Sequence, residues 1–403
     1  MTNFILFDDA RWESLLPLTF TRPVASLRIG IDTLAEKWEH YLQSEVSYLT
    51  EKYLSEKFPA RFSDENVYVN GGIIADENLS SAVKKLQKNS VLICNGELIA
   101  LNCSDKYFSR NSLLEHAKTL GTVEFQGTYK TISRPWHIFK MNDEVLRKDF
   151  ERITKNRKSA VLSSSVIFLG ENVFIEEGAK IEAVTINTTT GPVYIGKNTE
   201  VMEGAMIRGP FALCEGSVVK MGAKIYGATT VGEHCKVGGE LNNVVMQNFS
   251  NKAHDGFLGN SVIGEWCNIG ADTNNSNLKN TYAEVKLWDY ASQKFILTGL
   301  QFCGLIMGDH SKCGINTMFN TGTVVGVSSN IFGDGFPRNF IPSFSWGGAS
   351  GFTTYKLKDA FKVAEEVMKR RNIPFTDIDK KILTTVYEMS EKYRKGELIF
   401  LRK

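Results

Sequence analysis

A histidine in the second half of the chain is the residue type best suited to proton transfer at neutral pH. His254 lies in the segment HDGF, within residues 238–262, where a regular repeat loses its phase. An imidazole titrates near pH 7 without perturbation, so it can serve as a general base towards an amine. The alternative is a corner histidine that only binds the backbone, and the sequence leaves both interpretations open.

Two carboxylates follow the first predicted strand. Asp8 and Asp9 come directly after the apolar run NFILF. Side chains at the carboxyl end of a strand in an α/β sheet often face a ligand, and carboxylates bind Mg²⁺. The pattern therefore predicts contact with a ligand or with Mg²⁺, and the alternative is a pair of cap and turn residues before a helix.

The elements around His254 follow a repeat of six residues. The aliphatic positions are Ile195, Val201, Ile207, Leu213, Val219, Ile225, Val231 and Val237, and the same phase returns in residues 263–269 and 307–331. A period of six fits neither a helix nor an ordinary strand. Each hexad instead forms one side of a triangular prism whose coils stack in parallel about 4.8 Å apart. We predict a left-handed parallel β-helix, all β, over residues 161–348.

Two segments interrupt this repeat. Residues 238–262 lose the phase, and residues 278–303 contain two β-rich runs around a polar turn, which predicts a hairpin projecting from the prism. Insertions into a repeat array usually lie on its working face. We therefore expect the chemistry of the prism beside these interruptions.

The two ends of the chain have ordinary patterns. Residues 1–160 alternate strand and helix signals and predict an α/β domain, with a β-hairpin turning at Asn95 and Gly96 and helices over 32–43 and 142–155. Residues 349–403 predict two helices, over 355–371 and 377–393. We expect this helical extension to cover the open end of the prism, because a solenoid needs capped ends.

Composition limits the kinds of partner. The 47 basic and 45 acidic residues leave a net charge of +2 without charge blocks, so neither a nucleic-acid partner nor a membrane surface is expected. No apolar stretch approaches the ~18 residues of a membrane span. The seven cysteines form no CxxC pair, which predicts free thiols in a reducing, cytoplasmic setting. Small molecules and copies of the chain itself remain as partners.

Specific motifs add a family resemblance. The stretches GPFALCEGS and SNKAHDGFLGNSVIGEWCNIGADTNNSN resemble the acetyltransferase half of the bifunctional UDP-N-acetylglucosamine pyrophosphorylase / glucosamine-1-phosphate N-acetyltransferase family. LPLTFTRPVASLRIGIDTLAEKW and FPRNFIPSFSWGG resemble a variant bacterial branch of it with a sugar-nucleotidyltransferase-like N-terminal domain. The resemblance implies an acetyl-CoA donor, an amino-sugar 1-phosphate acceptor, UTP with Mg²⁺ at the N-terminal domain, and a homotrimer.

On the prism, the resemblance assigns roles residue by residue. His254 matches the family's catalytic histidine, and Asn268 and Asn277 match two asparagines that bind the sugar and the amine. In the resembling family this site lies between subunits.

The phosphate-binding positions depart from the family pattern. Asn242 stands where the family has a lysine that contacts the sugar phosphate. Lys279 and Lys286, together with Arg208 and Lys220, are cations that can replace it. The substrate can therefore differ from glucosamine-1-phosphate.

The N-terminal domain also departs from its family. The glycine-rich loop that cradles nucleotide phosphates is missing. The resemblance places Arg11 at the loop arginine, and Arg22 or Arg28 at the lysine that meets the sugar phosphate. We expect this domain either to transfer a nucleotidyl group from UTP or to bind a nucleotide sugar or sugar phosphate.

Two other functions stay open. The same prism carries zinc carbonic anhydrases, whose metal is held by three histidines, and His234, His254 and His310 are the histidines of this prism. Their uneven spacing does not resemble a compact ligand set. The lost glycine loop and lysine also fit a non-catalytic regulatory or assembly subunit that binds sugar nucleotides.

Overall fold

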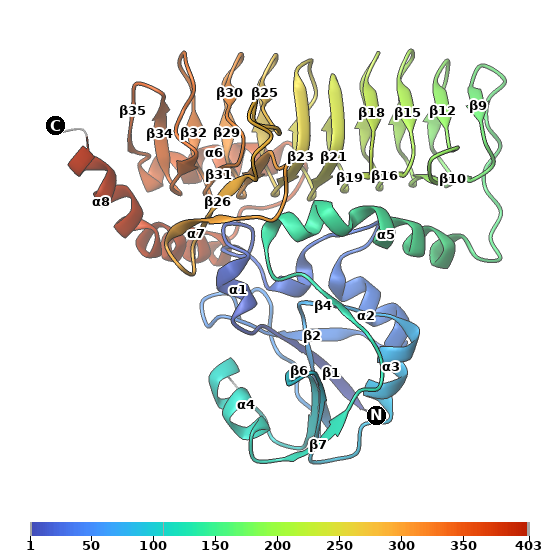
Figure 1. Ribbon diagram of the computed structural model, residues 1–403, viewed down its shortest axis with the longest axis vertical. Helices are drawn as coiled ribbons and strands as arrows, with labels where there is room; N and C mark the ends of the chain where they lie inside the picture. The colour runs from blue at the N-terminus through green and yellow to red at the C-terminus, as the bar shows by residue number, and fades with distance from the viewer. Residues whose placement is uncertain (1, 108, 401–403) are drawn as a thin grey trace.

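The computed structural model describes residues 2–107 and 109–400. The chain forms an N-terminal α/β region, a long parallel β-helix and three C-terminal helices (Figure 1). The predicted fold class is confirmed. The division into residues 1–160, 161–348 and 349–403 stays a prediction.

The N-terminal region is built on a six-stranded sheet of order β2-β1-β3-β6-β5-β7. The two strands beside β1 run parallel to it, β6 pairs antiparallel with β3, and β5 and β6 form the predicted hairpin with Asn95 and Gly96 in the left-handed conformation. The strands are β1 (Asn3–Phe7), β2 (Val46–Leu49), β3 (Asn66–Asn70), β4 (Ile73–Ile74), β5 (Ser90–Cys94), β6 (Glu97–Cys103), β7 (Gly121–Glu124) and β8 (Lys130–Thr131).

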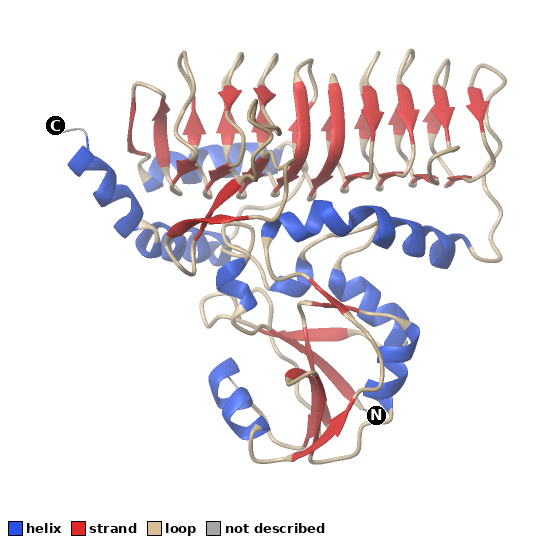
Figure 2. Cartoon of the chain, viewed as in Figure 1, coloured by secondary structure: helices blue, strands red, loops and turns tan. Residues whose placement is uncertain are grey.

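The helices of this region lie beside the sheet or, for α5 (Pro135–Thr154), between the sheet and the β-helix (Figure 2). They are α1 (Arg11–Ser14), the 3₁₀ turn η1 (Val24–Ser26), α2 (Leu34–Leu42), α3 (Glu77–Lys84), α4 (Arg110–Ala117) and α5 (Pro135–Thr154). α2 begins at a capping box made by Thr33 and Glu36. α5 begins seven residues before the predicted start, because Pro135 takes the first helical position, where its missing N–H costs nothing.

The β-helix has three flat faces. The hexad residues point inward: Ile195, Val219 and Val237 are fully buried. Val201 pairs with Val219, and Val219 with Val237, so each coil takes 18 residues, three hexads. The interior is therefore a continuous aliphatic column, as predicted.

The strands of the three faces follow in chain order around each coil. The first face comprises β10 (Val173–Ile175), β13 (Val193–Ile195), β16 (Phe211–Leu213), β19 (Thr229–Val231), the second halves of β21 (Glu240–Met246) and β23 (Phe257–Ile263), β28 (Leu305–Met307), β31 (Thr323–Val325) and β33 (Phe340–Ile341). The second face comprises β11 (Lys180–Ile181), β14 (Glu200–Val201), β17 (Val218–Val219), β20 (Lys236–Val237), β22 (Asn251–Lys252), β24 (Asn268–Ile269), β29 (Lys312–Cys313), β32 (Asn330–Ile331), β34 (Ser345–Gly348) and β35 (Gly351–Thr354). The third face comprises β9 (Ile167–Leu169), β12 (Thr185–Asn187), β15 (Met206–Arg208), β18 (Lys224–Tyr226), the first halves of β21 and β23, β25 (Asn274–Asn275) and β30 (Met318–Phe319).

The two interruptions of the repeat have different structures. Residues 238–262 stay on the prism, because β21 and β23 each run continuously across a corner at Asn243 and Asn260, both in the left-handed conformation. The repeat loses its phase here because the coil is shorter than 18 residues, and the chain does not leave the prism. Residues 278–303 do leave the prism and form the predicted hairpin, β26 (Lys286–Asp289) with β27 (Lys294–Leu297).

The C-terminal helices are α6 (Leu357–Lys369), α7 (Asp377–Met389) and α8 (Glu391–Phe400). α8 contacts β35, whereas α6 departs from the expectation that the helices cover the open end. The antiparallel pair β34 and β35 lies at the last coil. α6 lies along the second face: Ala360, Val363 and Ala364 share a small cavity with the backbone around Asn330. Its short alanine side chains, 4% and 2% exposed, let the helix approach the prism closely.

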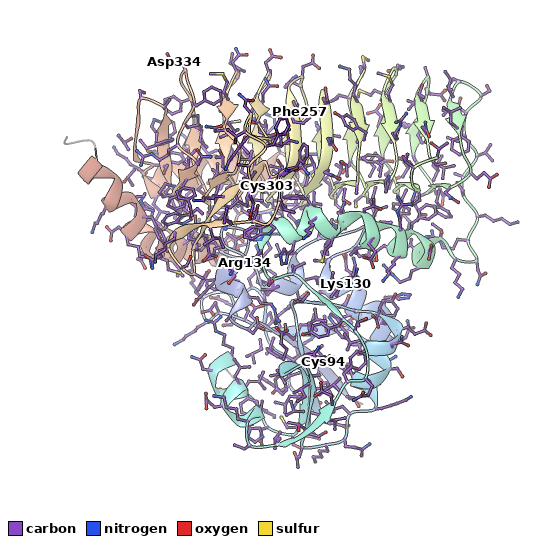
Figure 3. The ribbon with its side chains drawn as sticks, in the orientation of Figure 1. Cys94, Lys130, Arg134, Phe257, Cys303 and Asp334 are labelled. Carbon is purple, nitrogen blue, oxygen red and sulfur yellow. The ribbon has the colours of Figure 1, made fainter. Side chains whose placement is uncertain are left out.

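The N-terminal region rests on the first face of the prism through α5 (Figure 1). Asn142 of α5 donates to the carbonyl oxygen of Ala228 at 2.9 Å, and Leu146 packs against Ala212. Arg134, labelled in Figure 3, lies just before α5 and pairs with Asp289 of the hairpin at 2.8 Å. The prism and the N-terminal region therefore share an extensive interface.

Candidate functional site

His254 is presented by a turn that a buried lysine holds in place. Lys252, 1% exposed, points into the prism in register with Val237. Its ammonium donates to the carbonyl oxygens of Gly238 (3.1 Å), His254 (2.6 Å) and Asp255 (3.2 Å). Burial lowers the pKa of Lys252 to about 8. The turn over residues 253–256 is thus fixed from inside.

The His254 side chain itself is exposed at the corner between the second and third faces. Within the described residues, its imidazole forms no hydrogen bond or ion pair. A histidine that served only to bind backbone would have such a partner. The imidazole is therefore available to a ligand.

His254 borders a cavity of about 600 Å³ between the second face and the end of α6. The lining residues are Lys236, Asn251, Ala253, His254, Trp266, Cys267, Asn268, Lys312, Val367, Arg370 and Arg371. Four of these side chains are cations and none is a carboxylate. We call this space the His254 cavity.

The four cations have no counter-charge. Lys236, Lys312, Arg370 and Arg371 form no ion pair within residues 2–107 and 109–400. Lys312 donates to the carbonyl oxygen of His310 at 2.9 Å, and Arg371 to the side-chain oxygen of Asn251 at 3.4 Å. Like charges this close repel one another in a partly buried site, so the arrangement favours an anionic ligand.

The pKa values of the lysines reflect this environment. Burial lowers the pKa of Lys312 to about 8. Burial also lowers the pKa of Lys236, and the charges of Arg371, Lys220 and Arg370 lower it further. A bound anion would raise the pKa of both lysines again.

The structure brings one of the predicted asparagines to His254. Asn268 lines the His254 cavity, whereas Asn277 does not and instead donates to the side-chain oxygen of Asn260 at 2.8 Å. Asn242 lies on β21, at the third face. These two asparagines therefore belong to the next corner of the prism.

The two predicted lysines also lie elsewhere. Lys279 donates to the carbonyl oxygen of Glu284 within the insertion at 2.7 Å, and Lys286 is exposed on β26. The hairpin leaves the prism after β25, at the corner opposite His254 on the third face. Its Trp288 stacks on Phe340, so the insertion packs against the prism away from the His254 cavity.

Sequence reasoning missed the four cavity cations. Lys236, Asn251, Asn268 and Lys312 stand in register as one outward ladder on the second face. Each directly precedes an inward residue, and that spacing was available from the repeat. The two arginines end the predicted helix over 355–371, but the sequence did not show that this helix lies on the second face.

In the N-terminal region, Asp9 and Arg11 come together at the carboxyl end of β1 and β3. Asp9 pairs with the Arg11 guanidinium and accepts from the side chain of Asn70 at 2.8 Å. Arg11 also pairs with Glu97, which accepts from the hydroxyl of Tyr129. This polar cluster is the part of the sheet edge that can face a ligand.

Asp8 does not join that cluster. It is 2% exposed and accepts from the backbone N–H of Val24 (2.9 Å) and the hydroxyl of Thr50 (2.6 Å). Burial raises its pKa to about 7. Asp8 therefore holds the loop after α1, and in the described part of the chain no group of three His, Cys, Asp or Glu side chains could hold a metal ion.

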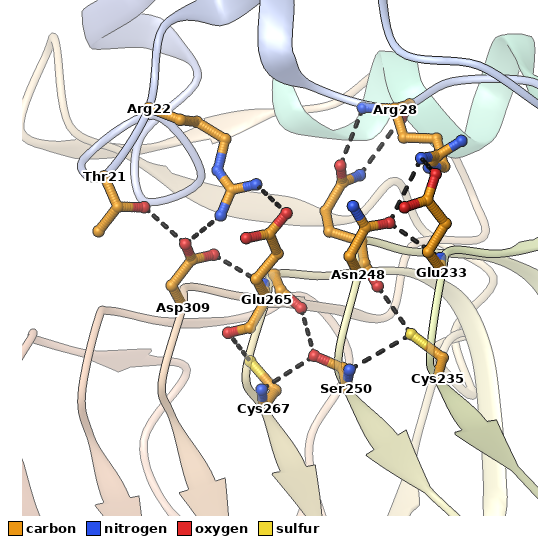
Figure 4. A network of polar contacts seen from close by, with 12 residues as sticks. Thr21, Arg22, Arg28, Glu233, Cys235, Asn248, Ser250, Glu265, Cys267 and Asp309 are labelled. Carbon is orange, nitrogen blue, oxygen red and sulfur yellow. Dashed lines mark hydrogen bonds and ion pairs between the residues drawn. The ribbon is translucent and has the colours of Figure 1, made fainter. Parts of the chain in front are cut away.

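Arg22 and Arg28 bind the β-helix (Figure 4). Arg22 pairs with Glu265 at 2.7 Å and with Asp309, and Arg28 pairs with Glu233 at 3.2 Å. Both arginines are about 5% exposed or less. These contacts correct the expectation of an open phosphate site: the guanidinium groups join the two parts of the chain, because carboxylates of the prism already occupy them.

The three histidines of the prism do not converge. His234 and His310 lie at the corner between the first and second faces, in a stacked row with Phe249 and Trp266. His254 lies at another corner. The seven cysteines are free and buried, as predicted.

Comparisons with known proteins divide along the same line as the fold. Residues 4–158 match the family model of the sugar nucleotidyl transferases. No curated protein matches the chain by sequence. No helix of the described residues is long and apolar enough to cross a membrane.

Several solved structures are similar to about half of the chain. The UDP-N-acetylglucosamine acyltransferase of Arabidopsis is 16% identical and covers 54% of this chain and 78% of its own, with a TM-score of 0.25. The polySia-specific acetyltransferase NeuO is 15% identical and covers 51% and 99%, with a TM-score of 0.27. LpxA, a UDP-N-acetylglucosamine acyltransferase from Bacteroides fragilis, is 13% identical and covers 55% and 95%, with a TM-score of 0.23.

Proposed function

We propose that the protein transfers an acetyl group from acetyl-CoA to the amine of an amino-sugar 1-phosphate in the His254 cavity. The observation that carries the proposal is an unpaired histidine at a cavity lined by four cations and no carboxylate. Histidine supplies the base, and the cations match a phosphate-bearing substrate.

The chemistry assigns His254 one proton transfer. As the amine nitrogen attacks the thioester carbonyl, the new C–N bond forms, His254 takes a proton from the nitrogen, and the C–S bond breaks to release the thiolate of CoA. The proton then leaves through His254 to the thiolate or to water. Asn268, on the adjacent coil, lines the same cavity and would bind the sugar.

Release of free thiol from acetyl-CoA, with glucosamine-1-phosphate and related amino-sugar phosphates as acceptors, tests this proposal. His254→Asn should lower kcat by about 100-fold or more, the usual contribution of a general base. His234→Asn, at the far corner, is the matched control and should keep its activity. If the wild type turns over none of the acceptors, the proposal fails and a non-catalytic regulatory subunit is the better interpretation.

We further propose that the N-terminal region binds the nucleotide part of a nucleotide sugar beside Asp9 and Arg11, where a ligand phosphate would replace the exposed Glu97 as a partner of Arg11. The family match over residues 4–158 and the polar cluster at the carboxyl end of β1 support this. Calorimetry with UTP and UDP-N-acetylglucosamine would test it, with Arg11→Met expected to weaken binding tenfold. Equal affinity in the variant would contradict the assignment.

A further inference from the structure

The His254 cavity continues along α6 into a second cavity. This second space, of about 710 Å³, lies between α6 and the β34–β35 pair and is lined by Trp346, Thr353, Thr354, Tyr355, Lys356, Asp359, Lys362, Val363, Glu366, Val367 and Arg370. Val367 and Arg370 line both cavities. A smaller cavity under the helix shares Lys312 with the first and Tyr355 with the second. Together they form one groove along α6.

One ladder of outward residues runs beneath this groove. Asn251, Asn268, Lys312, Asn330 and Trp346 occupy successive coils in register. Four steps of about 4.8 Å separate the first from the last, roughly 19 Å in all. The turn of His254 lies at one end of the ladder and Trp346 at the other.

The far end combines flat rings with cations. Trp346 is 39% exposed, and its ring lies 4.7 Å from that of Tyr355, centroid to centroid. Lys356, Lys362 and Arg370 form no ion pair in the part of the chain that the structure describes, although Asp359 and Glu366 also line the cavity. An exposed indole offers a stacking surface to a nucleobase, and unpaired cations bind phosphates.

We propose that this second cavity binds the phosphorylated adenosine end of CoA. The pantetheine arm then runs along α6 and delivers the thioester to His254. Extended, that arm of two amide units and their methylenes reaches roughly 15–20 Å, which matches the ladder. The assignment rests on the proposed function, because it takes acyl-CoA as the donor at His254.

One chain supplies the lining residues of this cavity. Its lining comes from β34, β35 and α6 of one copy, and the cations follow one side of the helix from Lys356 through Lys362 to Arg370. The phosphates would lie along this side, and the adenine on Trp346. Removal of the 3′-phosphate or of the whole nucleotide should weaken binding in steps.

Calorimetry of the full-length protein with CoA, 3′-dephospho-CoA and pantetheine tests the site without any acceptor. We expect Trp346→Ala and Lys362→Glu each to raise the Kd for CoA at least tenfold. Lys358→Glu, exposed on the same helix but outside the cavity, is the matched control and should leave Kd unchanged. Equal Kd values for the wild type and Lys362→Glu would overturn the site.

A kinetic comparison separates this inference from the proposed function. With acetyl-CoA, Lys362→Glu should raise KM about tenfold, and the preference for acetyl-CoA over acetylpantetheine should shrink. Turnover with an unchanged KM in Lys362→Glu and Trp346→Ala would refute the nucleotide site and leave the acetyl transfer standing. CoA binding that depends on Lys362, in a protein without turnover, would instead support the site and refute the acetyl transfer.

Discussion

The β-helix borders one cavity beside the N-terminal region and α7 and another beside α6, and the cations of these two cavities differ in whether they are paired. Where the N-terminal region and α7 meet the prism, a cavity of about 360 Å³ is bordered by two cations, and both are paired: Arg22 with Asp309 and Glu265, and Lys57 with Asp379. In the His254 cavity, four cations face one another without a carboxylate. The contrast lies within a few coils of one scaffold.

This difference distinguishes cations that hold the two parts of the chain together from cations that are free to bind a ligand. A buried cation is costly unless its charge is compensated. At the N-terminal interface, the compensation comes from the protein itself, so these ion pairs define how the two parts dock. In the His254 cavity, it must come from solvent or from a ligand. Unpaired charge is therefore the better guide to the substrate than charge alone.

The largest expected effect comes from breaking a pair at the N-terminal interface. Arg22→Ala leaves Asp309, which is 3% exposed, without its cation. Removing one partner of a buried pair typically costs about 3–5 kcal/mol. Urea unfolding should show a loss of this order, and Arg208→Ala, exposed on the third face, should show almost none. A loss below about 1 kcal/mol would mean that this interface is not held by its ion pairs.

The matching substitution in the His254 cavity should weaken ligand binding and leave the stability of the fold intact. Arg371→Gln removes a cation that has no carboxylate partner, so the free energy of unfolding should stay the same or rise slightly. Binding of a phosphate-bearing substrate should weaken by about 1.5–3 kcal/mol, the contribution of one hydrogen bond to a charged group. The KM of the acceptor, measured beside the unfolding curve, tests both expectations. A variant that loses stability and keeps its affinity would show that Arg371 stabilises the fold and does not bind the substrate.

The pH dependence of stability should carry a smaller signature of Lys312. Because burial lowers its pKa from 10.5 to about 8, the unfolded chain binds more protons at this site between those values. Stability contributed by Lys312 therefore rises with pH through this window. Relative to Lys312→Met, the wild type should gain on the order of 1 kcal/mol between about pH 7.5 and 10. If the difference in the free energy of unfolding between the two proteins does not change with pH, the Lys312 ammonium is solvated in the folded protein.

The smallest effect should come from a simple anion. Inorganic phosphate at a concentration equal to its Kd would stabilise the folded protein by about 0.4 kcal/mol. Thermal unfolding should show this shift in the wild type and a reduced one in Lys236→Gln. Sodium chloride at equal ionic strength is the control, since it screens the repulsion without filling the site. The same shift with both salts would argue against a phosphate site.

The sequence predicted the scaffold better than the site. A period of six has one simple structural solution, so the inward positions of residues such as Val219 and Val237 followed directly. The helix over 355–371 was also predicted, but its periodicity shows which side is apolar and not which surface it covers. For that reason the meeting of Arg370 and Arg371 with Lys236 and Lys312 could not be derived.

The N-terminal residues show a second limit. Asp8 and Asp9 are neighbours in the same predicted position, yet successive residues after a strand point in opposite directions. Asp8 is enclosed by Val24 and Thr50, whereas Asp9 joins Arg11 at the sheet edge. The partners of Arg22 and Arg28 lie more than 200 residues away in the chain, so no local pattern could reveal them.

The buried position of Lys252 makes the opening of the turn at His254 measurable. Lys252 is sealed from solvent by the same three carbonyl groups that shape the turn of His254. An amine-reactive reagent can reach it only during a local opening of that turn. The rate at which Lys252 becomes modified, measured by mass spectrometry, therefore reports how often this turn opens. A substrate that binds over His254 should lower that rate.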